Sequence, residues 1–89
     1  MFVIMVYDVN VKRVAKVLKT SRRYLLWVQN SVFEGEITKG KLNVLKSELS
    51  AIINDTEDSV IFYVWPKKLY SHRECIGMNK DFIDNLGLI

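Results

Sequence analysis

The first eight residues constrain the fold more than any other stretch of the chain. Six consecutive apolar or aromatic residues, Phe2 to Tyr7, are followed directly by Asp8. A short run of this kind, rich in β-branched and aromatic residues, predicts a strand that is buried on both faces. Asp8 is the only acidic residue among the first 33, and it stands at the carboxyl end of that strand. A carboxylate in this position calls for a cation, which is either a protein Arg or Lys or a metal ion.

Positive charge is concentrated directly after this strand. Residues 1–44 carry eight Lys or Arg against three Asp or Glu, whereas residues 45–89 carry five against seven. Such asymmetry indicates a polyanion partner, and the alternative is an ordinary solvated helix face. Six basic residues, uninterrupted by any acidic residue, are the candidate nucleic-acid contacts: Lys12, Arg13, Lys16, Lys19, Arg22 and Arg23.

The spacing of apolar residues predicts two helices. The first spans about residues 11–22, with Asn10 as its N-cap, and its buried stripe is expected to consist of Val11, Val14, Ala15 and Leu18. The second spans about residues 38–53, with Thr38 as its N-cap, and its apolar stripe is Leu42, Leu45, Leu49, Ile52 and Ile53.

Three further strands are expected, over residues 24–35, 58–65 and 69–76. The first of them is either one bent strand or two arms, 24–26 and 27–35, and its alternation predicts one shared face for Trp27, Gln29, Ser31 and Phe33. The resulting order is β-α-β-β-α-β-β when the segment 24–35 counts as two arms, and its simplest count is βαββαβ. It predicts an α+β ferredoxin-like sandwich, in which two helices cover one face of a single antiparallel sheet.

The other face of that sheet needs a cover of its own. Residues 2–8 and 58–65 are apolar on both faces, but two helices cover only one. A homodimer packed sheet to sheet is the simplest way to bury the open face. The chain is expected to form one domain over residues 1–77, followed by a tail, 78–89, whose apolar end can pair with the partner subunit's sheet edge.

Two features of the sequence bear on where the chain works. Cys75 is the single cysteine, so no internal disulfide framework is possible. No apolar run is long enough for a membrane span, and the amino terminus lacks the pattern of a signal peptide. We therefore expect a cytoplasmic protein that does not act at a membrane.

Asp8 is the main candidate for chemistry. One carboxylate is a poor metal site, but a residue near the two-fold axis of a dimer meets its own copy. Two Asp8 carboxylates would together suit a divalent metal that activates water and binds a phosphate. The alternative is structural, with Asp8 capping the first helix or pairing with Lys12 or Arg13.

Several of these segments together resemble a known family. They are Val6-Tyr7-Asp8, the following Lys12-Arg13, the string Val28-Gln29-Asn30-Ser31-Val32-Phe33-Glu34-Gly35, the strand Asp58-Ser59-Val60-Ile61-Phe62-Tyr63, and the late Ile76-Gly77. In this order they resemble the small CRISPR-associated endonuclease of the spacer-adaptation pair, which is the ferredoxin-like partner of the CRISPR integrase. The resemblance covers about residues 1–77.

The resemblance implies a homodimer with Mg²⁺ held between the two copies of Asp8. It implies cleavage of single-stranded RNA or double-stranded DNA, and a role with the integrase in spacer acquisition. Tyr7, Ser31 and Phe33 match positions that the family uses around its catalytic aspartate, as does Arg13. Trp27 is a departure, because many members have Arg there. Two alternatives stay open: a non-catalytic scaffold for duplex DNA, and a toxin-type RNA interferase of the same fold.

Overall fold

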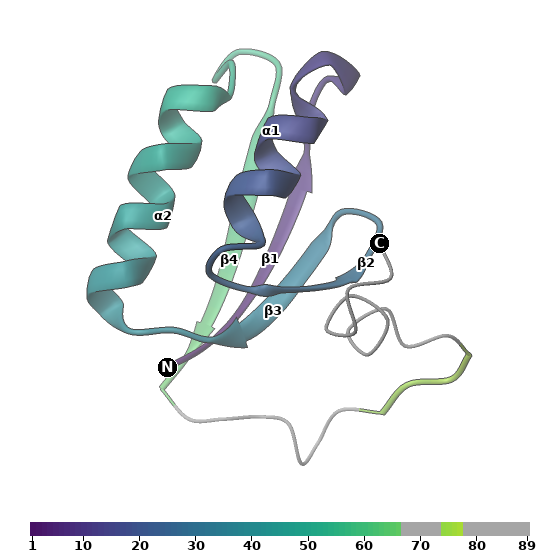
Figure 1. The fold of residues 1–89 in the computed structure, drawn as a ribbon, viewed down its shortest axis with the longest axis vertical. Helices are drawn as coiled ribbons and strands as arrows, with labels where there is room; N and C mark the ends of the chain where they lie inside the picture. The colour runs from purple at the N-terminus through teal and green to yellow at the C-terminus, as the bar shows by residue number, and fades with distance from the viewer. Residues whose placement is uncertain (67–73, 78–89) are drawn as a thin grey trace.

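The computed structural model describes residues 1–66 and 74–77. Its elements, in chain order, are β1 (Phe2–Asp8), α1 (Val11–Ser21), β2 (Leu26–Gln29), β3 (Val32–Glu36), α2 (Lys39–Ile52) and β4 (Ser59–Trp65). The strands form one antiparallel sheet in the order β2-β3-β1-β4. Figure 1 shows α1 and α2 side by side against this sheet. The predicted ferredoxin-like βαββαβ sandwich is confirmed.

The central strand β1 sends alternate side chains to the two faces of the sheet. Val3, Met5 and Tyr7 are buried in the core together with Leu45 of α2 and Val17 of α1, so this is the face that the helices cover. The side chains between them, including Asp8, point to the other face, which we call the open face. The end of the strand therefore has Tyr7 on the core side and Asp8 on the open side.

Helix α1 buries a stripe that only partly matches the predicted one, since Val14 and Leu18 are half-buried and Leu18 packs against the core. Val11 is 86% exposed and Ala15 is also exposed, whereas Val17 and Ser21 are fully buried. The Ser21 hydroxyl donates to the sulfur of Met5 at 3.7 Å, so a polar residue occupies part of the buried stripe. Apolar spacing alone gave the helix but set its rotation wrongly. The predicted N-cap is confirmed, because the Asn10 side chain accepts a hydrogen bond from the backbone N–H of Lys12.

Helix α2 has the predicted stripe and N-cap. Leu42, Leu45 and Leu49 are buried, and Ile52 packs partly against them. The Thr38 side chain accepts a hydrogen bond from a backbone N–H in the first turn.

The predicted strand over residues 24–35 is a β-hairpin. Its turn lies at Asn30 and Ser31, so the segment does consist of two short strands, as one of the two alternatives predicted, but the break is not between residues 26 and 27. Trp27 pairs with Phe33, but the register shifts after Trp27 and places Gln29 opposite Val32. Gln29 therefore does not share the face of Trp27 and Phe33. A polar dipeptide inside an apolar run is a turn signal, since such side chains hydrogen-bond readily to nearby backbone.

Two remaining expectations concern the carboxyl-terminal part of the chain. The strand expected over residues 69–76 is wrong at 74–76, which have no strand structure, and its earlier residues lie outside the described part. The tail, 78–89, also lies outside it. Neither α1 nor α2 is long and apolar enough to cross a bilayer.

Candidate metal and nucleic-acid site

Asp8 lies at the exposed carboxyl end of β1. Its side chain points to the open face, in register with Ser59 of β4. Within residues 1–66 and 74–77, the Asp8 carboxylate accepts no hydrogen bond and forms no ion pair. Asp8 therefore neither caps the helix nor pairs with Arg13, as the structural alternative required. Asn10 caps the helix, and Arg13 pairs with other acidic residues.

Two of the other predicted catalytic residues lie in the core instead of beside this carboxylate. Tyr7 is 5% exposed and Phe33 is fully buried, with their ring centroids 6.2 Å apart. The Tyr7 hydroxyl donates to the backbone carbonyl of Asn30 at 3.2 Å. Burial raises the pKa of the Tyr7 hydroxyl, and a side-chain hydrogen bond with Ser31 opposes that rise. The phenol is therefore protonated at neutral pH and acts as a donor.

Ser31 lies in the hairpin turn next to the end of β1. Its backbone carbonyl accepts a hydrogen bond from the Tyr7 N–H at 3.0 Å. Trp27 stabilises the same turn, because its indole N–H donates to the Asn30 carbonyl at 2.9 Å. Asn30 thus accepts from both Tyr7 and Trp27. The tryptophan that replaces an expected arginine fixes the hairpin beside Asp8.

The six predicted nucleic-acid contacts fall into two groups. Lys12, Lys16 and Lys19 are exposed on α1 and have no ion-pair or hydrogen-bonding side-chain partner in the described part of the chain. We call these three residues the lysine row. The arginines are all engaged: Arg13 with Glu57 and Asp58, Arg22 over the Trp27 ring, and Arg23 with Glu48.

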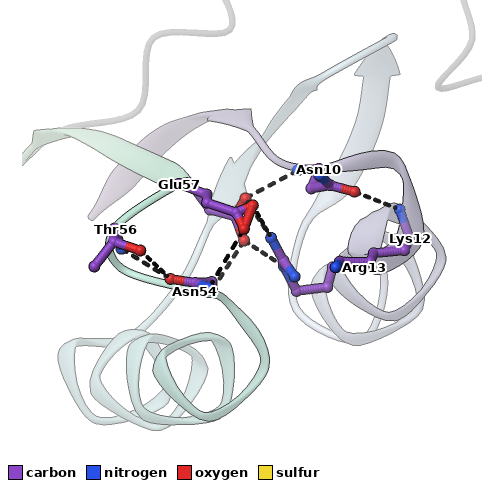
Figure 2. A network of polar contacts seen from close by, with 7 residues as sticks. Asn10, Lys12, Arg13, Asn54, Thr56 and Glu57 are labelled. Carbon is purple, nitrogen blue, oxygen red and sulfur yellow. Dashed lines mark hydrogen bonds and ion pairs between the residues drawn. The ribbon is translucent and has the colours of Figure 1, made fainter.

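Asp58 is the feature that sequence reasoning missed. Its side chain is fully buried, and its carboxylate accepts four hydrogen bonds: from Arg13 Nε at 2.6 Å, Arg13 Nη2 at 3.1 Å, and the backbone N–H groups of Asn10 and Asn54, both at 2.9 Å. Figure 2 shows Arg13 reaching from α1 toward Glu57, with Asn10 and Asn54 in the same polar network. The network joins the start of α1 to the turn between α2 and β4.

The charge state of Asp58 follows from these partners. Hydrogen bonds from Arg13 hold the pKa of the Asp58 carboxyl well below its ordinary value, and the backbone N–H groups lower it further, against the opposing effect of burial. Asp58 also raises the pKa of the Arg13 guanidinium, mainly through the hydrogen bond between them. The pair is therefore fully charged at neutral pH. The only sequence signal for this pair was the position of Asp58 at the start of a predicted strand. That position does not identify Arg13 as its partner.

The residues around Asp8 fit a metal ion only if a second chain contributes. The described part of the chain contains no group of three or more His, Cys, Asp or Glu residues that can hold a metal. The exposed Asp8 carboxylate is a hard oxygen ligand of the kind that Mg²⁺ prefers, and Mg²⁺ is often held by one or two carboxylates together with water and substrate phosphate. Asp8 and its copy would supply that pair.

Comparison with known proteins agrees with this architecture. The family model described as "CRISPR associated protein Cas2" matches residues 1–73. A protein of Dictyoglomus turgidum named CRISPR-associated endoribonuclease Cas2 is 57% identical over 91% of this chain and 93% of its own length. A Thermotoga maritima protein of the same name is 56% identical over 90% and 92%. The crystal structure of Streptococcus pyogenes Cas2 superposes with a TM-score of 0.77 at 36% identity, covering 86% of this chain and all of that one. The chain therefore belongs to the CRISPR-associated Cas2 family.

Proposed function

We propose that this protein is a Mg²⁺-dependent endonuclease of CRISPR spacer adaptation, which acts as a homodimer together with the CRISPR integrase. The observation that carries the proposal is the exposed Asp8 carboxylate at the open face of the sheet, which has no partner within residues 1–66 and 74–77. The name endoribonuclease borne by the Dictyoglomus and Thermotoga relatives supports cleavage of RNA. Duplex DNA is the second substrate that the proposal includes.

The open face supports the dimer. Ile61 and Tyr63 of β4 are 47% and 50% exposed, and they lie in register with Val6 and Ile4 of β1. A second copy packed on these residues removes apolar surface from water, and the two-fold symmetry brings equivalent residues together at the axis. Asp8 shares this face, so its carboxylate would lie at the same interface as its copy.

Each residue then has a defined task. The two Asp8 carboxylates would hold Mg²⁺, which would supply activation of water and neutralisation of phosphate charge. The lysine row binds backbone phosphates without reading sequence. Tyr7 and the hairpin turn at Ser31 hold the end of β1 from the core side, and Phe33 packs against Tyr7.

The test is a cleavage assay with Asp8→Asn beside the wild type. Both are incubated with single-stranded RNA and with duplex DNA, in Mg²⁺ and in a chelator. Asp55→Asn is the matched control, because Asp55 is also exposed and the substitution changes the charge equally. We expect cleavage that needs Mg²⁺, is lost in Asp8→Asn and is retained in Asp55→Asn. Equal cleavage by the wild type and Asp8→Asn would refute the assignment.

The lysine row favours a second candidate function, a non-catalytic scaffold for duplex DNA. Three exposed lysines on one helix can bind phosphates whether or not a bond is cleaved. In that case the wild type binds duplex DNA but cleaves neither substrate. Replacing Lys16 with Gln is expected to reduce the slope of log affinity against log salt by about 1, as for any residue that contacts one phosphate.

A further inference from the structure

Asp58 lies where it can control the position of Asp8. Ser59, the next residue, is the register partner of Asp8 across the β1–β4 ladder. The Asp58 carboxylate accepts a hydrogen bond from the backbone N–H of Asn10, two residues after Asp8, at 2.9 Å. The Asn10 side chain in turn accepts a hydrogen bond from the backbone N–H of Lys12 at 3.1 Å. The backbone that leaves β1 at Asp8 is therefore held from both directions.

Arg13 completes this arrangement and is poorly placed for another task. Its side chain is 15% exposed, compared with 60% for Arg23, and both Nε and Nη2 are bonded to Asp58. A phosphate that took these donors would leave the Asp58 carboxylate buried without its cation. Removing one partner of a buried ion pair destabilises a protein by far more than the intact pair stabilises it.

We propose that Asp58 is the positioning residue of the nuclease site, and that Arg13 acts on the reaction through Asp58 instead of contacting nucleic acid. The pair fixes the turn between β1 and α1 and thereby the direction of the Asp8 side chain. This inference rests on the proposed role of Asp8 as the metal ligand. Outer groups that orient metal ligands typically change activity or metal affinity by about 10- to 100-fold when they are lost.

The experiment compares Asp58→Asn with Glu48→Gln. Each substitution neutralises one carboxylate that pairs with an arginine in or next to α1, but the Arg23–Glu48 pair lies away from the β1–α1 turn. Arg13→Lys is the milder variant, because it keeps the charge and loses the paired hydrogen bonds. The measurements are the cleavage rate across Mg²⁺ concentrations, affinity for the RNA substrate in chelator, and amide chemical shifts of Val9 and Asn10.

We expect Asp58→Asn and Arg13→Lys to lower cleavage by about tenfold or more and to raise the Mg²⁺ concentration needed for half-maximal rate. RNA affinity in chelator should be unchanged. The variant that carries both substitutions should cleave no more slowly than the less active of the two single variants. Glu48→Gln should keep the wild-type Mg²⁺ dependence. Lower RNA affinity in Arg13→Lys, with effects that multiply in the double variant, would overturn the proposal in favour of direct phosphate contact.

The chemical shifts separate this inference from the proposed function. A wild type that cleaves nothing refutes the nuclease assignment, but the positioning claim still predicts large shift changes at Val9 and Asn10 in Asp58→Asn and none in Glu48→Gln. Unchanged shifts at both residues would overturn the positioning claim, whatever the activity. If Asp58→Asn does not fold, Arg13→Lys provides the same comparison.

Discussion

At the scale of single residues, two aspartates that are neighbours in space have opposite environments. Asp8 is exposed and unpartnered in the described part of the chain, so its carboxylate oxygens are accessible to a cation. Asp58 is buried and accepts four hydrogen bonds, so its oxygens are not available to a metal. The sequence marks Asp8 through its place after an apolar run. It does not mark Asp58, because the partner Arg13 is 45 residues away and only the folded chain brings the two together.

The depressed pKa of Asp58 makes the stability of the protein depend on pH. The carboxyl binds its proton more weakly in the folded chain than in the unfolded one, where its pKa is about 3.9. Its contribution is therefore complete at pH values well above the unfolded pKa and is lost progressively as the pH falls below about 5 toward the lower folded pKa. We expect the difference in melting temperature between the wild type and Asp58→Asn to be largest at pH 7 and to shrink toward pH 3. A melting-temperature difference that stays constant from pH 7 to pH 3 would contradict a depressed pKa for Asp58.

At the scale of elements, the helices and the central strands followed from apolar periodicity, but the rotation of α1 did not. α2 buries a regular row of leucines, which a pattern of spacing detects directly. α1 instead buries Ser21 and Thr20 and exposes Val11, because its orientation depends on contacts made by polar side chains. The position of the hairpin turn was missed for a related reason. One of the bonds that hold the turn comes from Tyr7, which lies 23 residues away from Asn30 in the sequence.

The leucine row of α2 should carry much of the stability of the helical layer. Leu45 is fully buried between the helices and the sheet, so Leu45→Ala leaves a cavity and is expected to cost about 2–5 kcal/mol of unfolding free energy. Val44 is its matched control, since it is 49% exposed on the same helix, and Val44→Ala should change stability by less than about 0.5 kcal/mol. Urea unfolding of both variants provides the measurement. Equal losses would show that α2 does not pack as described.

At the scale of the whole molecule, the sheet has one covered and one open face. The sequence predicted this imbalance, because residues of β1 and β4 are apolar at successive positions while only two helices are available. The family and the fold were also predictable from the chain. The homodimer and the shared metal site were also predicted from the sequence, and they stay predictions, since both involve residues of a second copy.

A charge placed on the open face should weaken the proposed dimer. Ile61→Lys places an ammonium among the apolar residues of that face and is expected to raise the dimer dissociation constant by at least about tenfold, because an unpaired charge is costly to bury. Val64→Lys is the control. Val64 is similarly exposed, 45% against 47%, but lies on the opposite face of β4. Sedimentation equilibrium should find Val64→Lys dimeric, and a dimeric Ile61→Lys at low concentration would argue against sheet-to-sheet packing.

The central claim is that one metal site needs Asp8 from both subunits. Differently tagged wild-type and Asp8→Asn chains, co-expressed and purified through both tags, give a dimer with a single Asp8. We expect this mixed dimer to show no Mg²⁺-dependent cleavage of RNA or DNA, although the wild-type dimer prepared in the same way cleaves. A mixed dimer with half the wild-type activity would show that each subunit works alone, and would contradict the shared site.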